Sequence, residues 1–472
     1  MHDNNSPYKI KDGETHFGSA EDTAAVTGFV LDHKAERALC RKLDIRLLPV
    51  LAIMFLLNGL DKGNLGNAKT AGMDQDLHFK SNQYNLALSI FYIPFVLTAP
   101  PLGIVGKKYG PSRVLPIMML VFGTMTVLAV TAQNWAGIMA LRWFLGELAR
   151  RMSVFYASSN IANAFSGLLA YGVFQIKHTS LYPWRYLFLI EGCLTVVFAV
   201  FAWFYLPLNP ERAGFLNEQE KKLAYHRIQV DSSAVVNQAF NLRDSLKIFR
   251  QPTTYAFLSI EVCLGVPLQS VALFLPQIVG RLGYSTIKTN LYTVAPNITG
   301  AVMLLILSFS SDFTRRRGPF IVLAFMFTLI GFIIYATIDV LENLKVAYFA
   351  TFMMCWGAGA PSILLCTWYN NNIPHEGRRM ALTSIGVPMA NLMGLVSSNI
   401  FTPQSAPKYI PALATTAAFG ATGLVLAGCL SLFMVLDNKR RDRKLGRKLD
   451  IQETPTELLM DGPSVPEFRW FL

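Results

Sequence analysis

The feature that most constrains this chain is a succession of apolar stretches, each about 20 residues long and carrying few charges. A stretch of that length is enough for an α-helix to cross the hydrocarbon core of a bilayer. None of the stretches shows the polar–apolar alternation of a transmembrane β-strand. The sequence therefore predicts an all-α protein that spans a lipid bilayer many times. The predicted spans are 47–66, 84–105, 114–134, 135–146, 153–176, 184–206, 254–279, 290–310, 319–338, 346–368, 380–402 and 411–436.

Composition supports this interpretation and excludes several classes of function. Hydrophobic residues make up 52% of the 472 residues and charged residues only 15%, whereas soluble domains carry about 25% charged residues. The net charge of +12 comes from basic clusters beside apolar stretches, which the positive-inside rule explains better than a nucleic-acid partner does. The sequence contains no phosphate-binding glycine loop, metal-ligand spacing or catalytic motif. We therefore expect no enzyme activity, no cofactor, no metal site and no nucleic-acid partner.

The basic clusters also predict the orientation of the chain, because lysine and arginine concentrate in short cytoplasmic loops. Clusters follow the second, fourth, eighth, tenth and twelfth predicted spans, and another lies in the polar N-terminal segment. Both termini and the central loop are therefore expected in the cytoplasm, with six spans on either side of that loop. The expected parts are an N-terminal segment at 1–43, a helical half at 44–206, a central loop at 207–250, a second helical half at 251–436 and a basic tail at 437–472.

Two short turns occupy equivalent places in the two halves. GIVGKKYGPSR (103–113) follows the second predicted span, and SDFTRRRGP (311–319) follows the eighth. Both contain glycine and several basic residues, as expected if the halves are repeats of one another. The second turn has Asp312 before its arginines, and the first lacks an equivalent aspartate. An alternative remains open, because any cytoplasmic turn tends to be basic.

Several stretches together resemble the anion:cation symporter family of the major facilitator superfamily, and within it the fungal allantoate and nicotinate permease branch. The resemblance implies the major facilitator fold, with two pseudo-symmetric six-helix halves that work by alternating access. It also implies a monomeric proton symporter of the plasma membrane that imports a small organic anion, such as a carboxylate metabolite or vitamin. The matching stretches are LDIRLLPVLAIMFLLNGLDKGNLGNAK (43–69), GPSRVLP (110–116), LRWFLG (141–146), FSGLLAYGV (165–173), WRYLFLIEG (184–192), LPLNPERAGFLNEQE (206–220) and WYNNNIPHEGRRMALTSIGVPMAN (368–391).

The fourth predicted span departs from the family pattern. Family members continue after Gly146 with a segment of roughly 20 residues that completes the helix, since a full span needs about that length. This segment is missing here, and 114–149 is too short for two full spans and a turn. We expect a truncated fourth helix and 11 to 12 spans in total. Two explanations remain open: an error in the gene model, or a true variant that is an inactive carrier remnant or a non-transporting membrane receptor.

The end of the first span carries the leading candidates for substrate and proton binding. Ionisable residues within a span are costly and are functional candidates by default. Asp61 and Lys62 are two such residues, although both could also reach water at the membrane surface. The resemblance implies that Lys62 binds the substrate anion and that Asp61 takes part in proton coupling. Asn64 and Asn67 add hydrogen-bonding groups in the next turns.

Two further charged residues lie inside predicted spans. Arg142 offers a guanidinium that can bind a carboxylate in two parallel bonds, and a surface position on a truncated helix is the alternative. Glu261 lies in a span that Pro267 interrupts, with Gln269 on about the same helix face. We expect Glu261 to face a cavity and to join Asp61 in proton coupling, with a helix–helix hydrogen bond as the alternative.

The remaining polar and aromatic residues are weaker candidates, because helix packing explains each of them at least as well. Glu191 is interpreted as a structural residue that pairs with Arg185. The cysteines are interpreted as small packing residues. The weaker candidates for substrate contact are Asn297, Asn391, Tyr171 and Trp368.

Overall fold

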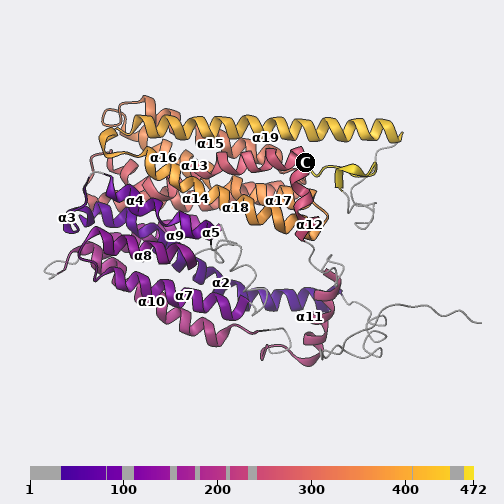
Figure 1. Cartoon of the computed structure of the whole chain (residues 1–472), viewed down its shortest axis with the longest axis horizontal. Helices are drawn as coiled ribbons and strands as arrows, with labels where there is room; N and C mark the ends of the chain where they lie inside the picture. Colours follow the sequence, from indigo (N-terminus) through magenta and orange to yellow (C-terminus); the bar gives the residue numbers. More distant parts are fainter. Residues whose placement is uncertain are drawn as a thin grey trace, which may run out of the picture. The chain divides into compact units, whose positions relative to one another are not determined.

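A computed structural model of the chain describes residues 33–80, 82–97, 111–148, 157–175, 181–208, 213–231, 242–406, 408–446 and 462–472. Within these ranges the chain is helical, without any β-strand (Figure 1). The α-helices are α2 (His33–Thr70), α3 (Met73–Asp76), α4 (Gln83–Ser89), α5 (Tyr92–Leu97), α7 (Pro111–Ala129), α8 (Trp135–Leu148), α9 (Ala157–Val173), α10 (Pro183–Tyr205), α11 (Glu218–Asp231), α12 (Leu242–Ser245), α13 (Pro252–Gly280), α14 (Thr286–Thr314), α15 (Gly318–Thr337), α16 (Leu344–Ala358), α17 (Ala360–Asn372), α18 (Glu376–Ile400) and α19 (Ile410–Leu445). The same ranges contain short 3₁₀ helices at Leu246–Arg250, Pro403–Ser405 and Gly462–Ser464.

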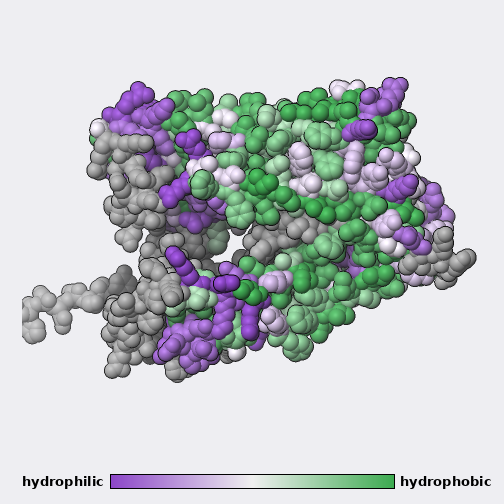
Figure 2. Space-filling model, turned by 180° about the vertical axis from the view of Figure 1, so that it is seen from behind, coloured by the Kyte–Doolittle hydropathy of each residue, from purple (hydrophilic) through white to green (hydrophobic). Residues whose placement is uncertain are grey.

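The described helices have the length and apolarity of membrane spans, which confirms the predicted all-α membrane fold. Nine helical segments of the described residues are long and apolar enough to cross a bilayer, and α16 and α17 together form one of them. Large apolar side chains point outward from these helices, and Phe204 and Phe313 remain 81% and 92% exposed. Figure 2 shows one face on which hydrophobic side chains form a broad band over the helices. Such a band is stable in lipid and would be costly in water.

The chain divides into two compact units. The smaller unit contains 1–46 and 209–236. In it, Leu39 and Leu223 belong to one small apolar cluster, and Lys42 Nζ lies 2.7 Å from Glu220 Oε2. A single ion pair of this kind, about one-third exposed, contributes little to stability.

The larger unit contains 47–208, here called the N-terminal half, and 237–472, the C-terminal half. Within the N-terminal half, α10 packs against α7. Within the C-terminal half, α15 packs against α16 and α19, and α13 packs against α18. The two halves meet where α9 packs on α14 and where α4 and α5 pack on α18. Residues from both halves therefore face one another across the α9–α14, α4–α18 and α5–α18 contacts.

The helix boundaries differ from the predicted spans in an informative way. The spans at 47–66 and 411–436 lie within longer helices, α2 and α19. Hydropathy marks only the lipid-embedded part of a helix, whereas backbone hydrogen bonding continues into polar sequence. The span at 346–368 is divided at Gly359 into α16 and α17.

The fourth span corresponds to α8, whose 14 described residues measure about 21 Å along the axis. That is shorter than the roughly 30 Å hydrocarbon core of a bilayer. Residues 149–156, which follow α8, lie outside the described ranges. The truncation of this span therefore stays a prediction.

Candidate functional site

A buried polar cluster lies where α2 meets α10. Asp61 and Asn64 are one turn apart on α2 and are 2% and 0% exposed. Thr195 Oγ1 of α10 donates a 3.3 Å hydrogen bond to Asp61 Oδ2. The Asn64 amide donates a hydrogen bond to Glu191 Oε2, also on α10. The second oxygens, Asp61 Oδ1 and Glu191 Oε1, are buried without a hydrogen-bond partner among the described residues.

The cluster continues toward α9 through hydrogen bonds. Ser166 Oγ of α9 donates to Asn64 Oδ1 at 3.4 Å and accepts a 2.6 Å hydrogen bond from Asn67 Nδ2. Three predicted residues, Asp61, Asn64 and Asn67, therefore share one face of α2. The side chain of the fourth, Lys62, lies outside the described residues, although its backbone is part of α2.

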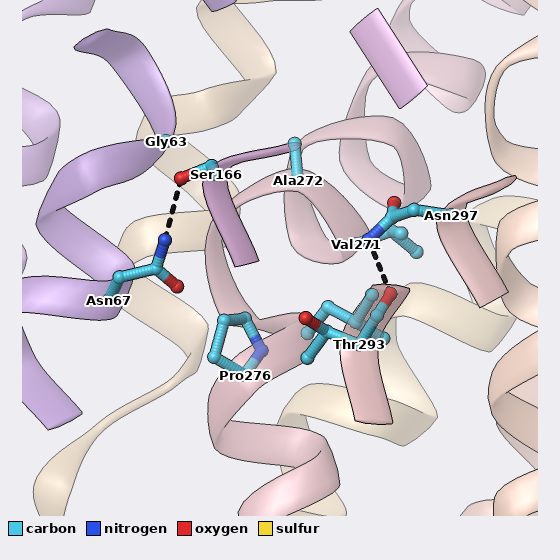
Figure 3. A pocket seen from close by; sticks show the side chains of 9 residues that line it. Gly63, Asn67, Ser166, Val271, Ala272, Pro276, Thr293 and Asn297 are labelled. Carbon is cyan, nitrogen blue, oxygen red and sulfur yellow. Dashed lines mark hydrogen bonds between the residues drawn. The ribbon is translucent and has the colours of Figure 1, made fainter. Parts of the chain in front are cut away.

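Asn67 also lines a small cavity between the two halves (Figure 3). Asn297 of α14 lies on the opposite side and donates a 2.9 Å hydrogen bond to the Thr293 carbonyl. Asn297 Oδ1 is buried without a partner among the residues that the structure describes. The full lining is Gly63, Asn67, Ser166, Val271, Ala272, Leu275, Pro276, Thr293 and Asn297.

The cavity measures about 20 Å³, which is room for roughly one water molecule. Pockets that bind small organic molecules measure about 300–1,000 Å³. In this conformation the cavity therefore cannot hold an organic anion, and the halves would have to separate to admit one. Its lining has the composition of a binding site, with apolar walls and a few convergent polar groups.

Arg142 forms a second buried polar centre, on α8. Its side chain is 4% exposed, and its Nε donates a long 3.4 Å hydrogen bond to the Ala87 carbonyl. The guanidinium carbon lies 5.4 Å from the centroid of the Phe91 ring, a cation–π distance. Over the described ranges, Arg142 makes no ion pair with a carboxylate. A buried guanidinium in this environment is an attractive site for an anion.

A hydrogen-bond chain links the neighbourhood of Arg142 to the C-terminal half. Tyr92 lies next to Phe91 and interacts electrostatically with Arg142. Its hydroxyl donates a 2.9 Å hydrogen bond to Gln269 Oε1, and Gln269 Nε2 donates to Asn391 Oδ1 at 3.2 Å. The structure thus brings three predicted residues, Arg142, Gln269 and Asn391, into one polar region that spans both halves.

Glu261 lies apart from both polar regions. It is 1% exposed, and it precedes Gln269 on α13 by eight residues, which is about 12 Å along the helix. The Cys366 thiol donates to Glu261 Oε1 at 3.8 Å, and the Tyr369 hydroxyl donates to Cys366 Sγ at 3.2 Å. Glu261 therefore faces α17 and not Asp61, and its role in proton coupling stays a prediction.

The two predicted aromatic residues lie away from the cavity. Trp368 is fully buried; its Nε1 donates a 2.9 Å hydrogen bond to the Phe471 carbonyl, and its ring packs edge-on against Phe257 at 5.4 Å. Tyr171 is half-buried on α9 and does not line the cavity. Substrate contacts by either residue stay predictions.

The structure also reveals a residue whose position the sequence analysis misjudged. Glu191 does not pair with Arg185, because Arg185 Nη2 lies 2.9 Å from Asp76 Oδ2 instead. Glu191 contacts Asn64 in the buried polar cluster where α2 meets α10. The sequence could have identified Glu191 as a functional candidate, because it lies near the middle of a 23-residue apolar helix. Glu261 was selected as a candidate because it is an ionisable residue inside a span, and the same holds for Glu191.

Comparisons with known proteins agree with this architecture. The family model described as Major Facilitator Superfamily matches residues 51–149 and 136–376. An uncharacterized transporter of Schizosaccharomyces pombe, C1039.04, is 49% identical over 97% of this chain and 94% of its own length. The high-affinity nicotinic acid transporter of Saccharomyces cerevisiae is 28% identical over 93% of this chain and 85% of its own length. The crystal structure of a D-xylose–proton symporter superposes with a TM-score of 0.60 at 13% identity, over 82% of this chain and 97% of that chain.

Proposed function

Because the chain belongs to the Major Facilitator Superfamily and is a multi-pass membrane transporter, we propose that it imports a small organic anion together with protons. Its substrate is a carboxylate metabolite or vitamin, and its closest functional class is the anion:cation symporters of the allantoate and nicotinate type. Transport proceeds by alternating access, in which the two halves rock about the central sites.

The main support for an anionic substrate is the weakly compensated, buried guanidinium of Arg142. A buried cation is stable only when an opposite charge or strong hydrogen bonds compensate it. The described partners of Arg142 are one carbonyl at 3.4 Å and an aromatic ring, which compensate it weakly. A substrate carboxylate would supply the missing charge and could bind the guanidinium in two parallel hydrogen bonds. The relative named as a nicotinic acid transporter supports a carboxylic acid as the cargo.

Proton coupling is supported by the carboxyl groups buried beside α2. Asp61 is buried among the helices without a cation paired to it in the described part of the chain. A carboxyl group in such a place exchanges protons more readily than it carries a permanent charge. Binding of a proton and of an anion in the same protein is then mutually favourable, because each offsets the charge of the other.

An inactive remnant or a non-transporting receptor is the less favoured alternative. The predicted truncation of the fourth span suggested this alternative. However, relatives named as transporters match nearly the whole chain, including one at 49% identity. We propose a plasma-membrane location and a monomeric state, as the family resemblance implies, and the basic clusters support termini that both face the cytoplasm.

Uptake measurements test this function directly. The full-length protein, with a tag that reports surface expression, would be produced in cells that lack endogenous nicotinic acid uptake. Labelled nicotinic acid and a panel of other carboxylates would be supplied with and without a protonophore. We expect saturable uptake of at least one carboxylate that the protonophore abolishes and that the uncharged amide of the same compound does not inhibit. Correctly inserted protein that transports none of the panel, or that transports the amide equally well, would refute the proposal.

A further inference from the structure

We propose that Glu191 and Asp61 act as one buried acid pair that carries the coupled proton, with Asn64 as the link between them. This proposal rests on the proton coupling proposed above and assigns it to a second residue. Glu191 is fully buried near the middle of α10. It accepts a hydrogen bond from Asn64, and Thr195, one turn further along α10, donates to Asp61.

The geometry of the two helices sets the separation of the carboxyl groups. Asp61 and Asn64 are one turn apart on α2, and Glu191 and Thr195 are one turn apart on α10. Asp61 contacts Thr195, and Asn64 contacts Glu191. The two carboxyl groups therefore lie about one helical turn apart, roughly 5 Å, and they interact electrostatically.

The groups that face this pair are mostly neutral. Thr126 of α7 lies near Asp61 and donates its hydroxyl to the Phe122 carbonyl, and Ser166 of α9 hydrogen-bonds Asn64. In the described part of the chain neither carboxyl group pairs with a lysine or arginine. Two carboxylates so close together in a medium of low dielectric constant cannot both carry a charge, so the pair retains at least one proton.

A continuous hydrogen-bond path connects the pair to the cavity. It runs from Glu191 to Asn64, then to Ser166 and to Asn67, which lines the cavity. Separation of the halves during transport would change the contacts of Ser166 and Asn67 first, because both lie at the junction with α13 and α14. The path therefore gives the acid pair a physical connection to the opening of the cavity.

Transport by purified protein in liposomes separates proton coupling from substrate binding. Glu191→Gln removes the acid and keeps the shape of the side chain. We expect it to lose nicotinic acid accumulation driven by a pH gradient by at least tenfold, and to keep the exchange of labelled for unlabelled nicotinic acid, which needs no net proton movement. Glu191→Asp keeps an acid and should retain accumulation with an altered pH profile. Glu342→Gln, an exposed glutamate, is the matched control and should resemble the unaltered protein.

Two results would overturn the acid pair. One is undiminished gradient-driven accumulation by Glu191→Gln. The other is a Glu191→Asp variant whose pH profile matches that of the unaltered protein. Failure of the proposed function has a different signature, because the unaltered protein itself would then show exchange without gradient-driven accumulation.

A separate observation carries a second inference, about the segment Gly462–Leu472. Phe468 and Trp470 are buried in the apolar core of the C-terminal half. The backbone N–H of Phe471 donates a 2.8 Å hydrogen bond to Asn372 Oδ1 on α17. Asn372 Nδ2 in turn donates a 2.9 Å hydrogen bond to the Phe471 carbonyl. Trp470 is held in the same way by Asn438 on α19, and the Arg469 guanidinium donates to Asp442 at 2.7 Å.

These contacts join the C-terminal end of α17 to α19, whereas the N-terminal end of α17 lies at a break in the helix. The ladder of α16 and α17 is interrupted at Gly359, and Pro361 lacks a backbone donor there. Breaks of this kind allow bending. We also propose that the segment Gly462–Leu472 is a detachable brace, which limits the movement of α17 and slows the transport cycle while it is docked.

Alkylation of Cys366 reports the movement of α17, because this half-buried thiol bonds Glu261 of α13. The double variant Phe468→Ala/Trp470→Ala would be compared with the conservative Trp470→Phe, after replacement of the other cysteines outside the core by serine. We expect the double variant to react with N-ethylmaleimide several-fold faster and to take up substrate faster, and Trp470→Phe to change little. Arg469→Gln, which loses the link to Asp442 and the guanidinium bonds to the Pro466 and Phe468 carbonyls, should have an intermediate effect. Unchanged alkylation, or slower uptake by surface-expressed protein, would show that the segment is not such a brace.

Discussion

The Tyr92 hydroxyl of the N-terminal half donates a 2.9 Å hydrogen bond to Gln269 Oε1 of the C-terminal half. Gln269 in turn bonds Asn391 of α18, and Ser89 Oγ of α4 lies 2.6 Å from Ser398 Oγ, also on α18. All of these groups are buried. The contact between the halves is therefore polar as well as apolar.

Removal of the Tyr92 hydroxyl should weaken this contact. Tyr92→Phe removes this hydrogen bond between the halves, at a cost of about 1 kcal/mol, which corresponds to roughly a fivefold shift between closed and open arrangements. We expect the maximal uptake rate to change by a few-fold, with protein expression unaltered. Tyr255→Phe is the control, because Tyr255 is exposed and lies on α13, the helix that carries Gln269. Identical kinetics for both variants would show that the hydrogen bond does not contribute to the closed state.

A close helix approach at Gly394 gives a second prediction. A Cβ atom at this position would overlap the Tyr92 ring. Gly394→Ala should therefore push α18 away from α5 and lower stability by about 1–3 kcal/mol, seen as a lower melting temperature in detergent. Gly428→Ala on α19 has no heavy atom within 4 Å of the new methyl group, and it should be neutral or stabilising by up to about 1 kcal/mol. Equal melting temperatures for the two variants would contradict the close packing.

The sequence predicted the membrane-spanning helices and the buried charged residues Asp61, Arg142 and Glu261 because charge inside an apolar stretch is a strong local signal. It could not predict which of those residues meet. Both the lipid-facing and the protein-facing sides of these helices are apolar, so the sequence pattern does not show how each helix is rotated. Glu191 illustrates this limit, since its partner Asn64 is 127 residues distant in sequence. The break at Gly359 was missed for a related reason, because hydropathy continues unchanged across it.

Arg142 is expected to set the affinity for the anion. Arg142→Gln removes the charge and should raise the KM for uptake by about 100-fold or abolish uptake, since charge-assisted bidentate bonds are among the strongest polar contacts. Arg142→Lys keeps the charge but loses the fork geometry, so an intermediate KM is expected. The control is Arg113→Gln, at an exposed position near the start of α7. A normal KM in Arg142→Gln would remove this residue from the anion site.

Asn297 offers a test that separates binding from folding. Its Oδ1 atom is buried without a partner among the described residues, so Asn297→Leu removes a costly unsatisfied group and should not lower the melting temperature. If the cavity opens into the substrate site, the same variant should raise the KM for uptake by about tenfold, the equivalent of one lost hydrogen bond. A variant with lower thermal stability and an unaltered KM would show that Asn297 serves only helix packing.

The ionic cluster around Asp244 should make stability depend on pH at the helix ends outside the membrane. Asp244 contacts Lys247 at 2.5 Å, His375 at 2.9 Å and Arg378 at 3.8 Å. The hydrogen bond from Lys247, with the nearby positive charges of Arg378 and His375, lowers the pKa of Asp244 below its usual value of 3.8. Because the folded-state pKa is the lower one, the contribution of Asp244 is complete above about pH 4 and disappears as the pH falls through the folded-state pKa.

The comparison that checks this dependence is thermal unfolding of the unaltered protein and of Asp244→Asn between pH 3 and 7. We expect the unaltered protein to melt at a higher temperature than the variant near neutral pH, by a small margin because the group is partly exposed. The two melting temperatures should converge toward pH 3, where the carboxyl group takes up a proton and no longer holds Lys247 and Arg378. A difference that grows as the pH falls would have the wrong sign and would exclude this cluster as a source of stability.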